Sequence, residues 1–357
     1  MSLSRIDFFD RNLNNIHHDV IDTPTIDQDY LAPENSEFSI NRTSLVKASD
    51  FVHISGAFDF FGVVNSVTDS NYLTKISVKP FITLFDANVL FDTNLQSGST
   101  ALETVLANFI NKYWMNSGDD AENLSILRTR TFSSTLDWGF NLKSDTEGMH
   151  HCIINFYNVL LFRALTKYGI SITPEVDFAN KKVTLNIGAI SEIRNIQVDR
   201  EGVGIGSFDI NRNSQIINKL VVYNTENYTS TRTYYLHSDG SYNTTNSDRL
   251  TPVVFDVKAS TPSGDISFAK AADDEASNTF GNIDWDSLIE LEVELDDALI
   301  KPLDYKLGTP TNVWHDGKAY NTILTCKNYS NKNVILSFGA VRTTLTKKQI
   351  LTNSKFN

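Results

Sequence analysis

The chain is short of cysteine, of long apolar runs and of positive charge. Its two cysteines, Cys152 and Cys326, form no CxxC pair, so we expect two buried free thiols rather than a disulfide framework or a zinc site. Apolar runs reach four or five residues, as at Val159–Phe162, whereas a membrane-spanning helix needs roughly 20. The charged N-terminal segment predicts no signal peptide. We therefore expect a protein that is made in a cytoplasm and has no stable membrane insertion.

The charge balance limits the partners that the surface can hold. Lysine and arginine number 31 against 43 aspartate and glutamate residues, which gives a formal net charge of −12. Because duplex-binding proteins neutralise phosphates with lysine and arginine, this balance argues against nucleic acid as a bound ligand. The same sign suits a surface past which DNA moves without sticking.

Two regions of the sequence predict β-structure. Short runs rich in β-branched and aromatic residues predict antiparallel strands at Phe51–Ile54, Phe60–Val64, Lys75–Val78 and Phe81–Phe85. Strands at about ten-residue spacing favour a barrel or a sandwich. The pattern returns at Ile170–Val176, Lys182–Ile187, Ile216–Tyr223, Thr231–Leu236, Leu288–Leu295, Tyr320–Thr325 and Asn333–Phe338.

Two helices are predicted between the β regions. The first begins at a capping box, Thr100–Glu103, and ends at Gly118, with apolar residues at three- and four-residue spacing. The second spans about 148–169, with Gly169 in the favoured C-terminal position. A short exposed helix is predicted within 259–280, where alanine and charged residues replace β-branched ones.

The predicted fold class is mainly β with α+β parts. We expect two antiparallel β-barrel-like domains plus helical or mixed subdomains. An N-terminal barrel occupies 1–98 and a helical or mixed domain 99–180. A second barrel domain occupies 181–345, with an inserted subdomain at about 225–285, and a polar tail follows at 346–357.

No motif supplies catalytic, cofactor-binding or metal-binding residues, and we predict none. His17–His18 and His150–His151 are adjacent pairs, which do not give the i, i+4 spacing of helical zinc ligands. The glycines of Glu201–Ser207 precede a turn-rich segment instead of the long helix of a nucleotide site, so a flexible or bulged loop is expected. No GxSxG or Cys/His signature indicates a nucleophile.

An acidic stripe is the one set of candidate site residues. In Leu288–Leu295, three glutamates alternate with apolar residues; they are Glu290, Glu292 and Glu294. The two-residue period of a strand places all three on one face. That face meets either bulk solvent or the inside of a conduit.

A saccharide-binding or saccharide-cleaving β protein is the alternative function. Tyrosine-rich segments at Tyr228, Tyr234–Tyr235 and Tyr242 provide rings that can stack on sugars. Half-exposed tyrosines of ordinary strands explain the same residues. The many carboxylates include no two that the sequence marks as an acid/base pair.

Several segments resemble the tail-tip hub proteins of siphophages. They are Phe60–Asn65, Thr74–Asp86, Tyr168–Ile172, Val313–Thr325 and Phe338–Lys347. These hubs form the structural part of the tail-associated-lysin family and are related to the central baseplate hub of contractile phages. Lactococcal phages are the nearest source that the resemblance suggests.

The resemblance implies a homotrimer at the distal end of a phage tail. Such a hub docks on the distal tail protein, contacts the tape-measure and receptor-binding proteins, and closes or lines the exit through which DNA passes. Two barrels related by approximate internal symmetry let three chains imitate a six-fold ring. The expected place is the virion baseplate, after synthesis in the host cytoplasm. The chain ends about ten residues beyond the last strand-like motif, without a peptidoglycan-cleaving extension, so no enzyme activity is expected.

Overall fold

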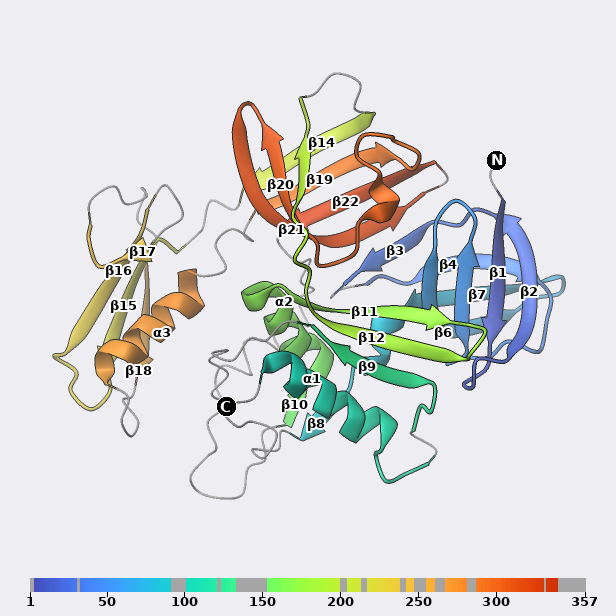
Figure 1. The fold of residues 1–357 in the computed structure, drawn as a ribbon, viewed down its shortest axis with the longest axis horizontal. Coiled ribbons are helices and arrows are strands. Elements are labelled where there is room, and N and C mark those ends of the chain that lie inside the picture. Colours follow the sequence, from blue (N-terminus) through green and yellow to red (C-terminus); the bar gives the residue numbers. More distant parts are fainter. Residues whose placement is uncertain are drawn as a thin grey trace. The chain divides into compact units, whose positions relative to one another are not determined.

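The computed structural model describes residues 3–30, 33–90, 101–120, 123–132, 153–199, 204–212, 217–237, 242–246, 255–260, 267–280, 287–330 and 332–339. The chain forms two compact units (Figure 1). Unit 1 comprises Met1–Asp209 and Glu290–Asn357, and unit 2 comprises Ile210–Ile289, which contains the residues of the expected insertion. The expected fold class, mainly β with two barrel-like sheets and small helical parts, is confirmed. In the described part of the chain, no helix has the length and apolarity to cross a membrane.

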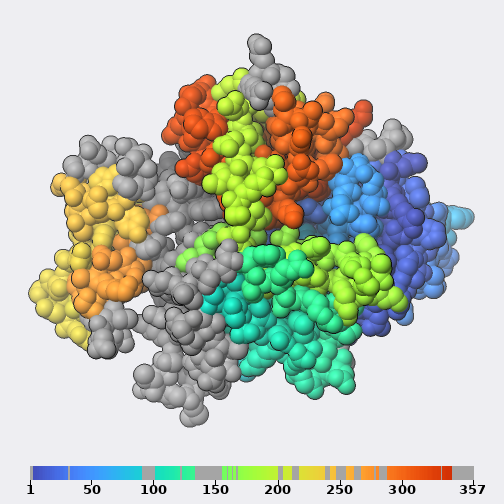
Figure 2. Space-filling model, viewed as in Figure 1, coloured from blue at the N-terminus to red at the C-terminus, as the bar shows by residue number. Residues whose placement is uncertain are grey.

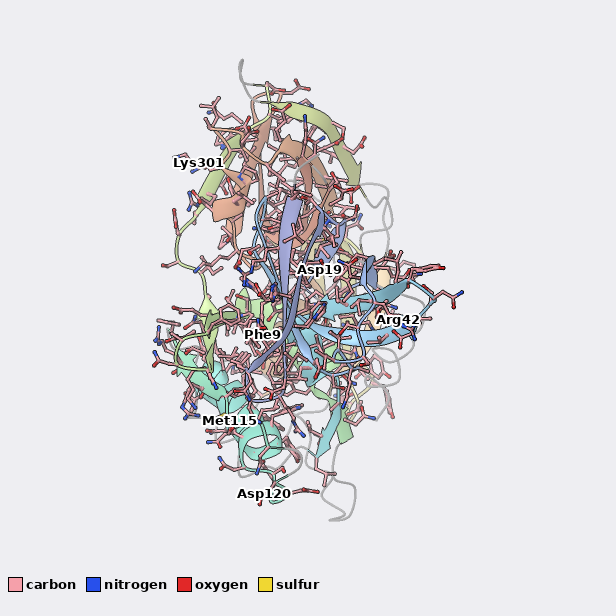
Figure 3. All side chains as sticks on the ribbon, turned by 90° about the vertical axis from the view of Figure 1, so that its right-hand side faces the viewer. Phe9, Asp19, Arg42, Met115, Asp120 and Lys301 are labelled. Carbon is pink, nitrogen blue, oxygen red and sulfur yellow. The ribbon has the colours of Figure 1, made fainter. Side chains whose placement is uncertain are left out.

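The first barrel of unit 1 is a six-stranded antiparallel sheet in the order β2-β1-β5-β6-β7-β4. Its strands are β1 (Leu3–Phe9), β2 (Asn15–Asp22), β4 (Ser36–Asn41), β5 (Phe51–Ser55), β6 (Phe60–Asp69) and β7 (Leu73–Pro80). The edge strands are joined by Asp19 of β2, whose carboxylate accepts hydrogen bonds from the backbone N–H and side-chain amide of Asn41 at 2.8 and 3.1 Å (Figure 3). Fully buried residues fill the interior; they include Ile6, Phe8, Val52, Ile54, Ile76 and Val78.

The prediction of a strand at Phe81–Phe85 is wrong, because this segment forms a 3₁₀-helix. Pro80 ends β7 and has no N–H with which to continue a ladder. Phe81, Ile82 and Phe85 are buried, which is a helical rather than an alternating spacing. The ring of Phe81 lies 5.5 Å from that of Phe51 in the barrel, so the apolar run closes the barrel core instead of extending its sheet.

Helix α1 (Leu102–Ile110) is present, and it begins later than the start of the predicted capping box. The N-cap residue is Ala101, which makes no side-chain cap hydrogen bond. Glu103 is fully buried, and its predicted partner Thr100 lies outside the described residues. The helix continues as a wider π-helical turn over Asn111–Met115. The apolar spacing thus identified the helix correctly and its start incorrectly.

The second helix begins later than predicted. Ile153–Asn155 forms strand β10, which pairs with β8 (Asn88–Leu90). A π-helical segment follows over Phe156–Leu161 and leads into α2 (Phe162–Tyr168). Gly169 then ends the helix with φ 64°, as predicted, because glycine adopts the left-handed conformation without a steric penalty.

The strands predicted at Ile170–Val176 and Lys182–Ile187 are present and form an antiparallel hairpin around Asp177–Asn180. Strands β11 (Ile170–Asp177) and β12 (Lys182–Ala189) pair along their whole length. The Asp177 carboxylate accepts the backbone N–H of Asn180 at 3.0 Å, as aspartate commonly does in turns. Strand β9 (Leu127–Thr131) adds to β12 in parallel.

Tyr30 connects four elements of unit 1. Its backbone N–H donates to Thr325 O at 2.9 Å, and its backbone oxygen accepts the Tyr157 hydroxyl at 2.8 Å. Its own hydroxyl accepts the backbone N–H of Ile172 at 2.7 Å. Burial raises the pKa of both tyrosines, which keeps their hydroxyls protonated. The N-terminal segment at Tyr30 is therefore fixed to the π-helical segment, the hairpin and the second sheet.

The second sheet of unit 1 has seven strands: six follow the order β13-β20-β21-β22-β19-β14, and the seventh, β3 (Ile26–Asp29), pairs with β21 beside this path. Its strands are β13 (Arg194–Gln197), β14 (Ile205–Arg212), β19 (Ser287–Glu294), β20 (Pro310–His315), β21 (Lys318–Tyr329) and β22 (Asn333–Gly339). The prediction of a flexible or bulged loop with a turn-rich continuation is wrong for residues 205–212. These residues form strand β14.

Strand β21 pairs with different partners along its length, and one of them comes from the N-terminal region. Its first half pairs with β20, and its second half pairs with β3. The register places Cys326 opposite Asp29, and the buried Cys326 thiol donates to Asp27 Oδ1 at 3.3 Å. N-terminal and C-terminal residues therefore lie against one another in unit 1 (Figure 2).

Unit 2 is a four-stranded sheet with one helix on it. The order is β17-β16-β15-β18, with strands β15 (Lys219–Asn224), β16 (Thr231–Leu236), β17 (Tyr242–Asn243) and β18 (Phe255–Ser260). Helix α3 (Phe268–Phe280) was expected to be exposed, but one face is buried against the sheet. The residues of this core include Leu220, Val222, Tyr234, Leu236, Ala272, Ala276 and Phe280. Small alanines allow the helix to approach the sheet closely.

Candidate functional site

The acidic stripe of β19 has the alternation that the sequence predicted. Glu290 and Glu292 are half-buried and Glu294 is exposed. The apolar residues between and before them are fully buried; they are Ile289, Leu291 and Val293. The strand therefore separates a barrel core on one side from a carboxylate-bearing surface on the other.

Small polar groups of neighbouring strands contact this acidic surface. Ser337 of β22 donates its hydroxyl to Glu290 Oε1 at 3.2 Å, and Asn333 donates its amide to Glu292 Oε1 at 2.7 Å. A Cβ atom at Gly206 of β14 would lie 3.5 Å from the Glu292 carboxyl group. The glycine of the Glu201–Ser207 motif thus leaves room beside the stripe.

Asp297 extends the acidic surface beyond the end of β19. Its Oδ2 accepts the backbone N–H of Gly204 at 2.8 Å, and its Oδ1 accepts those of Leu299 and Ile300 at 2.9 and 2.7 Å. Burial acts to raise the pKa of Asp297, but the three N–H donors outweigh it and lower that pKa. The carboxylate therefore stays ionised at neutral pH and fixes the loop.

Sequence reasoning missed a cluster of Asp199, His315 and Asp316. His315 Nδ1 lies 2.8 Å from Asp199 Oδ1, and the Asp316 backbone N–H donates to Asp199 Oδ2 at 2.6 Å. These bonds lower the pKa of Asp199, with the Asp316 N–H as the larger cause. The three side chains are close enough to share a metal ion. Each is nevertheless accessible to solvent, and the Asp199 carboxylate already has partners within the protein.

The histidine pairs behave differently from one another. His17 and His18 lie on β2 within the first barrel and belong to no group of potential metal ligands in the described residues. His150 and His151, together with Cys152, lie outside the residues that the structure describes.

The tyrosines of the saccharide alternative do not form one platform. Tyr234 is buried under α3 and donates its hydroxyl to Asp273 Oδ1 at 2.5 Å. Tyr242 packs against Phe280 of the same helix, with ring centroids 5.4 Å apart. Tyr228 is exposed and stacks on Tyr223. The rings are thus divided between a core and a surface, and nothing in their arrangement favours sugar binding.

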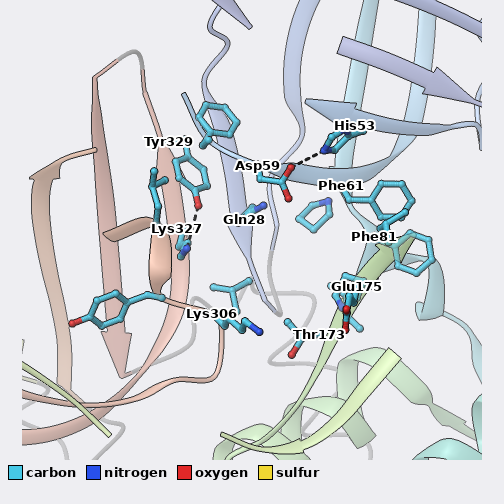
Figure 4. A pocket seen from close by; sticks show the side chains of 18 of the residues that line it. Gln28, His53, Asp59, Phe61, Phe81, Thr173, Glu175, Lys306, Lys327 and Tyr329 are labelled. Carbon is cyan, nitrogen blue, oxygen red and sulfur yellow. Dashed lines mark hydrogen bonds and ion pairs between the residues drawn. The ribbon is translucent and has the colours of Figure 1, made fainter. Parts of the chain in front are cut away.

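A cavity of about 850 Å³ lies within unit 1, lined by residues from the first barrel, β11 and the second sheet (Figure 4). The lining side chains that bear on its chemistry are His53, Asp59, Glu175, Lys306, Lys327 and Tyr329. The two acids have partners of their own: Asp59 lies 2.6 Å from His53 Nε2, and Glu175 accepts the Asn186 amide at 3.2 Å. The cavity therefore holds charges of both signs, with the Asp59 carboxylate beside His53 and the Glu175 carboxylate bonded to a neutral amide.

Lys327 is the unusual residue of this cavity. It is only 5% exposed, and its Nζ donates to Tyr329 Oη at 3.2 Å. Burial lowers the pKa of Lys327 to about 8, against the opposing effect of the Asp304 charge. A lone lysine in a strand pattern gave no signal in the sequence, because burial of its side chain depends on the distant β3.

The fold matches solved phage tail proteins over nearly its whole length. The 43 kDa tail protein of prophage MuSo2 from Shewanella oneidensis matches with a TM-score of 0.55 and 11% identity, over 95% of this chain and 98% of that one. A tail protein from Neisseria meningitidis matches with a TM-score of 0.51 and 10% identity, over 94% and 96% of the two chains. The chain has the fold of phage tail proteins.

A further match is a chain of the phage P2 baseplate in its activated conformation with Ca. It has a TM-score of 0.50 and 14% identity, and it covers 96% of this chain and 100% of that one. No protein-family model and no curated protein matches the sequence. The resemblance to baseplate hubs seen in the sequence is thus confirmed in the fold, and the lactococcal source stays a prediction.

Proposed function

We propose that the chain is a structural hub of a phage baseplate, present as a homotrimer at the distal tip of the tail. The observation that carries the proposal is the match to phage tail proteins over 94–96% of the chain, including both barrel-like sheets. The pairing of β3 with β21 also supports a mechanical role, because it ties an N-terminal strand into the second sheet by backbone hydrogen bonds.

The proposed partners follow from this position. The trimer docks on the distal tail protein and also contacts the tape-measure and receptor-binding proteins during host attachment. The hub acts as plug and conduit, and DNA meets it only in passage. The chain is made in the host cytoplasm and incorporated into the virion.

The oligomeric state and the position in the virion test this role directly. Size-exclusion chromatography with light scattering should give a mass of about 120 kDa, three times the 40.1 kDa chain. An antibody against the chain should label the distal tail tip in electron micrographs of virions. A monomer at all concentrations, together with absence of label from the tail, would contradict the proposal.

The acidic stripe is proposed to face the conduit. Three chains would carry a formal charge of −36, and like-signed walls repel the phosphates of the passing duplex. Glu290, Glu292 and Glu294 form a continuous row on one face of the strand, with Glu294 exposed and Glu290 and Glu292 half-buried beside small polar residues.

Reversal of the stripe tests the conduit. Changing Glu290, Glu292 and Glu294 to lysine alters each chain by +6, from −12 to −6, and places cations where phosphates pass. Assembled variant particles should eject DNA more slowly, most strongly at low salt, where screening is weak. The matched triple change to glutamine removes the charge without adding cations and should have a smaller effect. Unchanged ejection in assembled lysine variants would reject the conduit assignment.

We also propose that the chain has no enzyme activity of its own. The support is the lack of nucleophile, acid-pair and cofactor motifs in the sequence. Incubation of the purified protein with host cell walls should release no reducing sugar and no free amine above a buffer control. Release that scales with protein concentration would overturn this part of the proposal.

A further inference from the structure

The cavity at Lys327 contains a buried cation that feels the charge of Asp304 but forms no ion pair with a carboxylate among the described residues. None of the described residues forms an ion pair with its Nζ, and the Tyr329 hydroxyl is its hydrogen-bond partner. An ammonium group has three N–H donors, so one bond to Tyr329 leaves donors for a second group. Burying an ammonium without an anion is costly, and an anion in the adjoining cavity would relieve that cost.

Aromatic rings make up much of the remaining wall. Tyr329 stacks on Phe58 with centroids 4.3 Å apart, and Phe61 stacks on Phe81 at 5.0 Å. All four residues line the cavity. A volume of about 850 Å³ falls within the range of small-molecule sites. The ligand that this wall favours therefore has an apolar or aromatic body.

We propose that this cavity is an anion site for a carboxylate carried on an aromatic body, with the carboxylate held by Lys327 Nζ and the Tyr329 hydroxyl. Figure 4 shows Lys327 and Tyr329 side by side on the wall formed by the second sheet, with Lys306 on the same wall. The site is independent of the baseplate role, because all of its residues belong to unit 1 of a single chain.

The charges of the lining favour a carboxylate over a phosphate. Asp59 and Glu175 also line the cavity, and both are exposed acids. Their negative charge repels a phosphate dianion more strongly than a monocarboxylate. A single buried ammonium with one hydroxyl donor also matches the two oxygens of a carboxylate.

Calorimetry with small probes on the full chain tests the site. The probe is 3-phenylpropionate, and its neutral counterpart is 3-phenylpropanamide, which has the same shape without the charge. We expect the acid to bind at least tenfold more tightly than the amide at pH 7. Lys327→Met should remove this preference, and Lys47→Met, which removes an exposed charge elsewhere, should keep it. Since methionine in place of a buried charge is usually tolerated, the variant should remain folded, as checked by thermal melting.

The outcomes show whether the site exists and whether its carboxylate comes from a protein segment or from a free small molecule. If the capped dipeptide acetyl-Phe-Asp-amide binds as tightly as 3-phenylpropionate, the site accepts an acidic protein segment. If only 3-phenylpropionate binds, the site takes a free small carboxylate. Equal affinity for acid and amide, full affinity in a folded Lys327→Met variant, or no binding at millimolar probe would overturn the proposal.

Discussion

The protein should become more stable as the pH rises from 7 towards 10, because the buried Lys327 ammonium loses its proton and the cost of burying its charge disappears. Its pKa falls from the ordinary 10.5 to about 8 in the folded state, chiefly because of burial. At pH values between these two, the unfolded chain binds more protons than the folded chain, so the free energy of unfolding increases with pH. Below about pH 8 both states are protonated, and the full cost of burying the charge is present.

The magnitude follows from the pKa difference. The fall of the Lys327 pKa from 10.5 to about 8 corresponds to about 3 kcal/mol at pH 7, of which about 2 kcal/mol should be regained by pH 9.5. Lys327→Met removes this cost and also the hydrogen bond to Tyr329, which is worth about 1 kcal/mol. The variant should therefore be about 2 kcal/mol more stable than the parent at pH 7.

Denaturant unfolding of parent and variant between pH 7 and 9.5 measures the effect. The difference between the two should shrink with pH, because only the parent contains the titrating group. Above about pH 10 both proteins should lose stability, because the buried Tyr305, whose pKa is raised to about 12, ionises more readily when unfolded. A stability difference that is constant across this range would refute the reasoning.

Three further substitutions test the core. Leu160→Asp places a carboxylate at a fully buried site and should cost at least about 4 kcal/mol; a melting temperature within a degree or two of the parent would show that the helix is misplaced. Tyr157→Phe removes the hydroxyl donor to Tyr30 O and should cost about 1–3 kcal/mol in denaturant unfolding, and no measurable loss would show that this bond is replaceable. Gly62→Ala puts a Cβ 2.6 Å from the Phe60 ring and should cost about 1–3 kcal/mol, so an unchanged midpoint would contradict the close packing of β6.

Local patterns predicted the elements whose structure depends on local chemistry. The alternation around Glu292 identified the two faces of β19, and Gly169 identified the end of the second helix, because each depends on backbone geometry at nearby residues. The run at Phe81–Phe85 was misassigned, since its apolar residues fit a strand until Pro80 ends the ladder.

The candidate sites needed information that no local pattern contains. Asp199 meets His315 across 116 positions, and Lys327 becomes buried only when β3 pairs with β21. Neither residue is unusual among its sequence neighbours. Their chemistry is a property of tertiary contacts, whereas the acidic stripe is a property of one strand.

The pairing of β3 with β21 has a consequence for how the chain is made. Asp27 and its partner Cys326 are 299 positions apart, and a ribosome adds about 5–20 residues per second. Strand β3 therefore waits about 15–60 s for its neighbour while the rest of the chain is synthesised. During that interval its backbone groups form an open edge, and unpaired edges invite association with other chains. The protein is thus expected to complete unit 1 only after synthesis, with slow folding typical of long-range strand pairing.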